Sequence, residues 1–246
     1  MKINIHEDKK NTSKFAAEKA KDILIETIEK KGKAVFVIAT GNSQLDFLDY
    51  LVNLEDIDWS KTTLYHLDEY VGINEDHRAS FRKYIRNNFI SKVGEIKKVN
   101  LIDGMNNPER ECQRLNKIIA EDEIDISFVG IGENGHLAFN EPPADFETED
   151  PFIVVELDEM SRKQQVKEGW FDSIKSVPKK AITMTIKEIM SSEHIICTVP
   201  EKRKAEAVKN CLGNEIITPD YPASILKKHK STYVYLDENS AELLDL

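Results

Sequence analysis

Short apolar segments rich in β-branched residues alternate with amphipathic helical segments along the chain, and this alternation restricts the fold more than any other feature. Segment 34–40, AVFVIAT, ends at Gly41 and precedes the helical pattern LDFLDYLV. Expected strands are 34–40, 62–67, 124–131, 152–157, 194–200 and 231–237, and expected helices are 14–31, 45–52, 80–93, 107–123 and 201–212. Because the strands are continuously apolar, they predict an α/β fold: a mostly parallel sheet, Rossmann-like, with helices on both faces.

The length and charge of the chain limit its organisation and its partners. A chain of 246 residues with 40% hydrophobic content is long enough for one sizeable core, so we expect a single domain over residues 1–246. The formal net charge of −10 argues against nucleic acid or an anionic membrane as a general partner. A small anion could still bind in a local basic pocket.

Cysteine usage and hydropathy indicate where the protein works. Cys112, Cys197 and Cys211 show neither CxxC nor zinc-like spacing, which is typical of reduced thiols in a cytosolic protein. The first residues lack the apolar segment of a signal peptide, and no later run approaches the roughly 20 apolar residues that span a bilayer. We therefore expect a cytoplasmic protein.

The stretch GIGENGHLAFNEP, residues 130–142, matches the GxGxxG pattern of a dinucleotide-binding loop directly after an expected strand. That motif requires a helix that opens at its third glycine, but here Pro142 and Pro143 interrupt the segment after that glycine. The alternative is that the glycines let the backbone approach a ligand and place His136 and Glu141 beside it. A histidine shuttles protons near neutral pH, and a carboxylate can fix its tautomer.

Three further strand ends carry polar side chains. Asp68 follows strand 62–67, where a buried carboxylate could act as a base. Thr40, Gly41, Asn42 and Ser43 follow strand 34–40 and could hold a phosphate at the start of the next helix. Lys202, Arg203 and Lys204 follow strand 194–200, so one cation could reach the same edge. Taken singly, Asp68 is better explained as a helix cap or a salt-bridge partner, and Lys202, Arg203 and Lys204 as a solvated helix face.

Their common position at the carboxyl ends of parallel strands is what favours function, because ligands of open α/β sheets bind there. Phosphate-binding groups, a carboxylate base and a histidine with a carboxylate indicate proton-transfer chemistry on a phosphorylated sugar. The pattern includes no metal cluster. The acidic, proline-bearing loop 140–151 is a candidate flap over the site.

Four motifs, in order along most of the chain, resemble the glucosamine-6-phosphate deaminase (isomerase) family: ATGNSQ (39–44), LDEYVG (67–72), GENGHLAFNEP (132–142) and VPEKRKA (199–205). The resemblance implies a Rossmann-like fold and conversion of an amino-sugar phosphate to a keto-sugar phosphate and ammonia. It implies no cofactor and a small phosphorylated sugar as the partner, and it allows a homo-oligomer.

The resemblance also implies roles for single residues. Asp68 matches the base that moves a proton from C2 to C1 of the opened sugar. His136 matches the acid and base of ring opening, and Glu141 matches the carboxylate that assists it. Loop 40–43 and Lys204 match the phosphate-binding groups.

Two positions depart from the family pattern. Asn134 stands where many of these deaminases have an aspartate, and asparagine can orient the imidazole but cannot supply charge. Lys167 is the nearest match to a phosphate-binding arginine, and Arg162 is a substitute in the same segment. A lysine binds phosphate without the bidentate geometry of arginine.

Two other functions fit a similar sequence. A 6-phosphogluconolactonase shares the fold but needs no base for enolisation at C2. A regulatory protein that binds a sugar phosphate without turnover would keep the pocket and lose the chemistry. The DEYVG and GHLAFNEP stretches favour the deaminase, because Asp68, His136 and Glu141 are all present.

Overall fold

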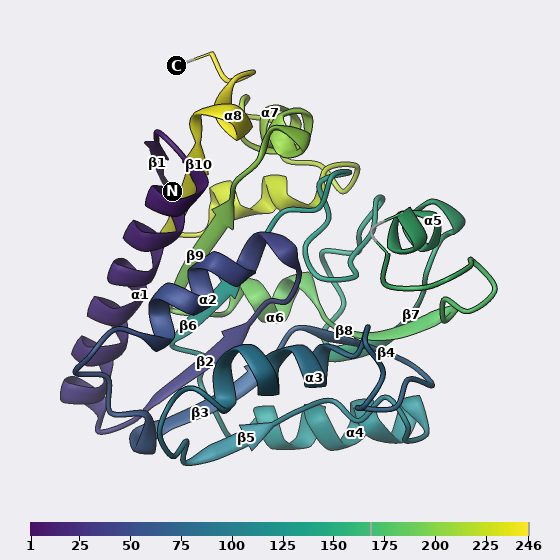
Figure 1. Ribbon diagram of the computed structural model, residues 1–246, viewed down its shortest axis with the longest axis horizontal. Helices are drawn as coiled ribbons and strands as arrows, with labels where there is room; N and C mark the ends of the chain where they lie inside the picture. The colour runs from purple at the N-terminus through teal and green to yellow at the C-terminus, as the bar shows by residue number, and fades with distance from the viewer. Residues whose placement is uncertain (168, 246) are drawn as a thin grey trace.

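The computed structural model describes residues 1–167 and 169–245 of the chain (Figure 1). A seven-stranded parallel sheet forms its centre, with the strand order β1-β10-β9-β6-β2-β3-β5. Its strands are β1 (Lys2–His6), β2 (Ala34–Ile38), β3 (Thr62–His66), β5 (Lys98–Asn100), β6 (Ile126–Val129), β9 (His194–Val199) and β10 (Thr232–Asp237). The predicted fold class, α/β with a mostly parallel sheet, is confirmed.

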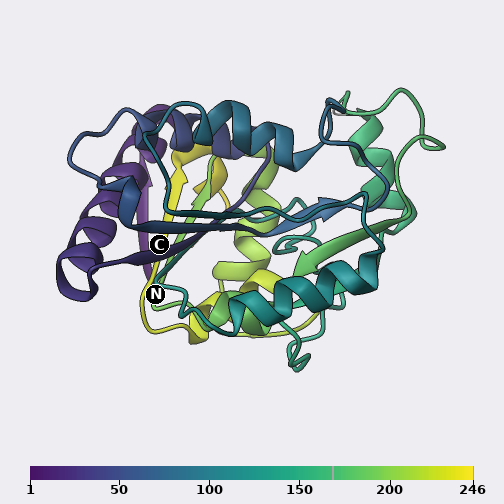
Figure 2. The same cartoon turned by 90° about the horizontal axis from the view of Figure 1, so that it is seen from below.

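Helices cover both faces of this sheet, as Figure 2 shows from below. The described helices are α1 (Lys9–Lys31), α2 (Leu45–Val52), α3 (Phe81–Ile85), α4 (Pro108–Ile119), α5 (Glu159–Lys167), α6 (Ile186–Met190), α7 (Ala205–Leu212) and α8 (Glu238–Ala241). Helices α1, α2 and α3 pack on one face, around Phe36 and Phe128. Helices α4, α6 and α7 pack on the other face, around Val37 and Cys197. Because alternate strand residues point to opposite faces, both faces of the strands are apolar, as the sequence predicts.

A second, three-stranded antiparallel sheet lies beside the first, in the order β4-β8-β7. It consists of β4 (Asp68–Tyr70), β7 (Phe152–Glu156) and β8 (Lys180–Met184). Segment 152–157 forms a strand, as expected, but its strand β7 pairs in the antiparallel sheet and not in the central parallel one. Residues 153–155 are only half-buried, because the edge strand β7 is covered less completely than a strand in the central sheet.

Helix α1 begins earlier than the sequence indicates. The helix was expected from residue 14, but Asp8 is its N-cap residue, and the side chain of Asp8 accepts a hydrogen bond from the amide of Asn11 at 2.8 Å. Gly32, with φ of +73°, ends the helix in the left-handed conformation that glycine adopts without strain. None of the helices in the described ranges is long and apolar enough to cross a membrane.

Segment 130–151 contains turns and one isolated bridge but no helix. A dinucleotide loop needs the helix N-terminus that this segment lacks, so the structure rejects the dinucleotide interpretation of GxGxxG. The loop 140–151 is anchored, because the amide of Ala144 donates to the carbonyl of Pro219 at 3.0 Å. Of its residues only Glu141 lines the cavity at the carboxyl ends of the central strands, so the expected flap does not cover the site.

Candidate active site

One cavity opens at the carboxyl ends of β2, β3, β6 and β9, and we call it the strand-end cavity. Eight of the residues predicted for the site line it: Thr40, Gly41, Asn42, Ser43, Asp68, His136, Glu141 and Lys204. They come from four separate parts of the sequence and meet because parallel strands end at the same edge of a sheet. The structure thus brings together the predicted base, the predicted histidine–carboxylate pair and most of the predicted phosphate-binding groups.

Asp68 lies where the chain leaves the parallel sheet and enters the antiparallel one. It follows β3, opens β4 and pairs in register with Thr183 of β8. Its side chain is 7% exposed and borders the strand-end cavity. Burial, and then the negative charge of Glu69, raise the pKa of Asp68 to about 8. A carboxyl group tuned in this way takes up a proton near neutral pH, which suits a general base.

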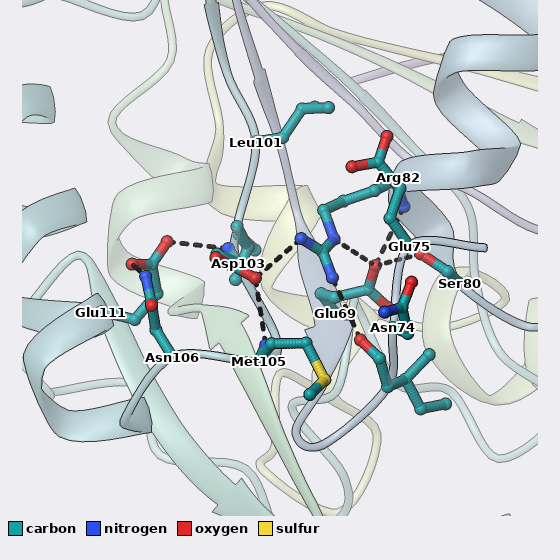
Figure 3. Close-up of polar contacts among 12 residues, drawn as sticks. Glu69, Asn74, Glu75, Ser80, Arg82, Leu101, Asp103, Met105, Asn106 and Glu111 are labelled. Carbon is teal, nitrogen blue, oxygen red and sulfur yellow. Dashed lines mark hydrogen bonds and ion pairs between the residues drawn. The ribbon is translucent and has the colours of Figure 1, made fainter. Parts of the chain in front are cut away.

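Glu69, the residue after Asp68, is fully buried and belongs to a polar network (Figure 3). Its carboxylate accepts hydrogen bonds from the hydroxyl of Ser80 at 2.9 Å and from the amide of Arg82 at 2.9 Å. The guanidinium of Arg82 in turn contacts Asp103 at 2.7 Å. Buried charges require such partners. The network therefore fixes β4 against the start of α3, and so fixes the backbone that carries Asp68.

His136 and Glu141 face each other across a tight loop. The Nδ1 atom of His136 lies 3.2 Å from Oε1 of Glu141, and the two side chains are 24% and 12% exposed. Asn134 supports both residues: its Oδ1 accepts from the amide of His136 at 3.2 Å, and its Nδ2 donates to Oε2 of Glu141 at 2.5 Å. Asn134 thus orients both members of the pair through hydrogen bonds, which an amide side chain can make without carrying charge.

Glu141 remains a carboxylate in this environment. Burial alone would raise its pKa, but the contact with His136, and then those with Asn134 and Ser161, outweigh burial and lower the pKa to about 2. Its other oxygen contact comes from Ser161, whose Oγ donates to Oε1 at 2.8 Å. A permanently ionised Glu141 can stabilise a protonated imidazole, but it does not exchange protons near neutral pH.

Gly132 leaves room for the imidazole. A Cβ atom at this position would lie 2.3 Å from Nε2 of His136, well inside the contact distance of real side chains. The amide of Gly132 donates to the carbonyl of His136 at 3.0 Å, so backbone and ring pack closely here. Gly132 therefore makes room for the histidine ring.

We predict that Gly132→Ala displaces the His136 ring and lowers kcat/KM by about 100-fold, because a shift of about 1 Å in a reacting group has an effect of this size. Gly94→Ala is the matched control, since nothing lies within 4 Å of a Cβ atom there. Steady-state kinetics with thermal unfolding curves would check this. Unchanged kinetics in Gly132→Ala would contradict the close packing of the ring.

The predicted phosphate-binding groups, apart from Lys167, lie at the N-termini of two helices. Loop 40–43 leads through a 3₁₀ turn (Asn42–Gln44) into α2, and Lys204 ends the 3₁₀ turn (Lys202–Lys204) that leads into α7. Gly41 has φ of +110°, and its carbonyl accepts from the hydroxyl of Tyr84 at 2.9 Å. Strands β2 and β9 flank β6, so the two helix starts lie on either side of one strand end. Helix N-termini and a lysine both favour an anion.

The structure does not bring Lys167 to this group. The residue is exposed at the end of α5 and is absent from the described lining of the strand-end cavity. Arg162, the suggested substitute, donates instead to the carbonyls of Ile174 at 2.6 Å and Val177 at 3.1 Å. One guanidinium nitrogen thus bonds to two main-chain carbonyls, which anchors α5.

Several lining residues escaped the sequence prediction. Ser161 and Gln165 come from α5, Trp170 follows it, and Arg78 precedes α3. None of them follows a strand of the central sheet, so the strand-end rule that found the other residues does not apply to them. Within the described ranges, no three histidine, cysteine or acidic side chains come together as a metal site.

Proteins of known sequence and structure resemble this chain over its whole length. It is 38% identical over 251 residues to a glucosamine-6-phosphate deaminase of Clostridium acetobutylicum, covering 99% of this chain and 100% of that one. The corresponding protein of Streptococcus pyogenes serotype M1 is 38% identical over 246 residues and is covered completely, as is this chain.

Two solved structures extend the likeness. A monomeric glucosamine-6-phosphate deaminase superposes with a TM-score of 0.87 at 34% identity, covering 99% of this chain and 100% of that one. The 6-phosphogluconolactonase of Trypanosoma brucei superposes with a TM-score of 0.81 at 15% identity, covering 98% and 97%, a likeness of fold alone. With residues 7–235 matching its sequence profile, the chain belongs to the family of glucosamine-6-phosphate isomerases and 6-phosphogluconolactonases.

Proposed function

We propose that this protein converts glucosamine 6-phosphate and water to fructose 6-phosphate and ammonia. The observation that carries the proposal is the meeting of Asp68, the pair His136 and Glu141, and Lys204 around one strand-end cavity. The full-length relatives named as glucosamine-6-phosphate deaminases support the same reaction. A lactonase would need no carboxylate placed for proton removal from carbon, so the buried Asp68 favours the deaminase.

Ring opening is the first chemical step of the proposal. His136 accepts the proton of the C1 hydroxyl and returns a proton to the ring oxygen, which leaves an aldehyde at C1. The ionised Glu141 at 3.2 Å stabilises the imidazolium that forms in between. Opening is required because only the aldehyde makes the C2 hydrogen acidic.

Isomerisation and deamination follow. Asp68 removes the proton from C2 and delivers it to C1, while O1 takes up a proton released by the amine nitrogen, so the aldehyde becomes an alcohol and the C2 amine becomes an imine. Water then adds to C2, and ammonia leaves. The oxidation at C2 balances the reduction at C1, so the carbon skeleton exchanges no electrons with an outside carrier.

Ammonia and fructose 6-phosphate formation from glucosamine 6-phosphate tests the proposal, with 6-phosphogluconolactone as the competing substrate. We expect ammonia release from the amino sugar and no hydrolysis of the lactone above the spontaneous rate. Lactone hydrolysis without ammonia release would assign the other reaction of the family. Tight binding of glucosamine 6-phosphate without turnover would assign a binding protein.

We predict that Lys204→Met raises KM for glucosamine 6-phosphate by about 10- to 100-fold, because a charge-assisted contact to phosphate contributes about 1.5–3 kcal/mol. Lys204 is only 6% exposed, and methionine retains about the length of the lysine side chain without its charge. Lys209→Met, an exposed lysine of α7, is the control. If Lys167 also holds phosphate, as the sequence predicted, Lys167→Met raises KM in the same assay. An unchanged KM in Lys204→Met would remove that residue from the phosphate site.

We further propose that the protein works in the cytoplasm. Cys112, Cys197 and Cys211 are all buried and free, which suits a reducing compartment.

A further inference from the structure

Helix α5 reaches the predicted ring-opening pair through one side chain. Ser161, on its first turn, lines the strand-end cavity and donates from Oγ to Oε1 of Glu141 at 2.8 Å. This is the same oxygen that faces Nδ1 of His136 at 3.2 Å. The other oxygen, Oε2, accepts from Asn134. Both oxygens of Glu141 are therefore held, one from the histidine loop itself and one from a separate helix.

The position of Ser161 is fixed by contacts that do not involve the cavity. Its amide donates to Oδ1 of Asp158 at 2.7 Å. The next residue, Arg162, anchors α5 to the carbonyls of Ile174 and Val177. These contacts fix the backbone at Ser161, and the fixed backbone keeps the hydroxyl within reach of Glu141.

The hydroxyl of Ser161 has one proton and two carboxylates near it. Oδ2 of Asp158 lies 3.3 Å from Oγ, against 2.8 Å for Oε1 of Glu141. Hydroxyl to carboxylate hydrogen bonds are short, so the distances favour donation to Glu141. Asp158 can still accept the proton if α5 shifts, and Oε1 would then keep only its contact with His136.

We propose that Ser161 is a positioning residue, which holds Glu141 against His136 and makes ring opening depend on the placement of α5. The inference rests on the proposed deaminase reaction for its kinetic consequence. It extends the pair to a chain of three side chains, Ser161, Glu141 and His136, of which only His136 exchanges protons with the sugar. It also explains how this family member holds Glu141 with two neutral donors, Asn134 and Ser161.

Kinetics of Ser161→Ala and Ser161→Thr in the full-length protein test this role. Ser161→Ala should lower kcat by about tenfold with KM changed less than about twofold, because it removes one hydrogen bond to a charged group. Ser161→Thr retains the hydroxyl and should recover most of the activity. Ser176→Ala is the matched control, since Ser176 is exposed and its hydroxyl bonds to the main-chain carbonyl and amide of Ser173.

A double-mutant cycle with Glu141→Gln separates positioning from a general effect on folding. If Ser161 acts through Glu141, Ser161→Ala lowers kcat about tenfold in the wild type and less than about twofold in Glu141→Gln. Equal losses in both backgrounds would overturn the proposal.

A measurement without turnover distinguishes failure of this inference from failure of the proposed reaction. The ¹⁵N chemical shift of Nδ1 of His136, assigned by comparison with His136→Ala, should move in Ser161→Ala and stay close to the wild-type value in Ser161→Thr and Ser176→Ala. An unmoved signal in Ser161→Ala would overturn the proposal whichever reaction the protein catalyses. If the signal moves in a protein that releases no ammonia, the positioning contact is supported and the proposed function is refuted.

Discussion

The Asp68→Asn variant is expected to release ammonia about 10³- to 10⁴-fold more slowly than the wild type, because a general base contributes up to this factor and asparagine cannot accept the C2 proton. The exchange of the C2 hydrogen with D₂O should fall by the same factor, since proton removal precedes every later step. Affinity for glucosamine 6-phosphate should change little, because Asp68 acts on the sugar carbons and the phosphate is held elsewhere. Proton exchange by NMR, ammonia release and calorimetric binding together measure these quantities.

An Asp68→Asn variant that retains ammonia release would assign the base to another residue. A variant that loses binding as well as turnover would show that the substitution disturbs the cavity. Asp103→Asn is a useful comparison, because this carboxylate belongs to the neighbouring network of Glu69 and Arg82 but is absent from the described lining of the cavity. It should retain far more activity than Asp68→Asn.

The same substitution should stabilise the protein increasingly as the pH rises. The folded-state pKa of Asp68, about 8, lies above its ordinary value of 3.8, so the folded protein binds this proton more tightly than the unfolded chain does. In the wild type, the protonated Asp68 contributes its full stability below about pH 4, and this contribution is lost as the pH rises through about 8. The difference in Tm between Asp68→Asn and wild type should therefore grow from about pH 5 to about pH 9. A constant difference would mean that the carboxylate is not destabilised by burial.

The position of the site could be predicted from the sequence because ligands of open α/β sheets bind at the carboxyl ends of the strands, and these strands are recognisable as continuous apolar segments. Asp68 and loop 40–43 follow buried strands directly, and their meeting at one cavity needed only the parallel arrangement. Strand β4, three residues long, and edge strand β7 lack a pattern that separates them from the central sheet. The antiparallel sheet was missed for this reason.

The contribution of α5 could not be predicted in the same way. Ser161 contacts Glu141 although the two residues are 20 positions apart in the sequence. The position of Ser161 depends on how the chain turns between the end of β7 and the start of α5. Lys167 was matched by resemblance to a family position, which carries no information on the direction in which its helix runs. The structure shows that the cations reaching the cavity from this side of the fold include Arg78, which precedes α3. Its guanidinium bonds to the carbonyl of Trp170 at 2.9 Å.

His136→Ala should impair ring opening much more than the later steps. With ordinary glucosamine 6-phosphate we expect kcat/KM to fall by about 10³-fold, within the range of a lost general acid and base. The 5-deoxy analogue cannot close the six-membered ring, so on this substrate the loss should be at least about tenfold smaller. The ratio of the two losses isolates ring opening, because proton transfer by Asp68 is common to both substrates.

The Glu141→Gln variant provides the control for this comparison. Glutamine retains the shape of the side chain but removes the charge that lies 3.2 Å from the imidazole. Glu141→Gln should therefore also lose more kcat/KM on glucosamine 6-phosphate than on the 5-deoxy analogue. Both losses should be smaller than those of His136→Ala, since the imidazole itself remains. Equal losses of His136→Ala on both substrates would falsify the ring-opening role. The pair would then have to act after enolisation, on the addition of water to C2 or the departure of ammonia, where an imidazole beside a fixed carboxylate is equally competent to move a proton.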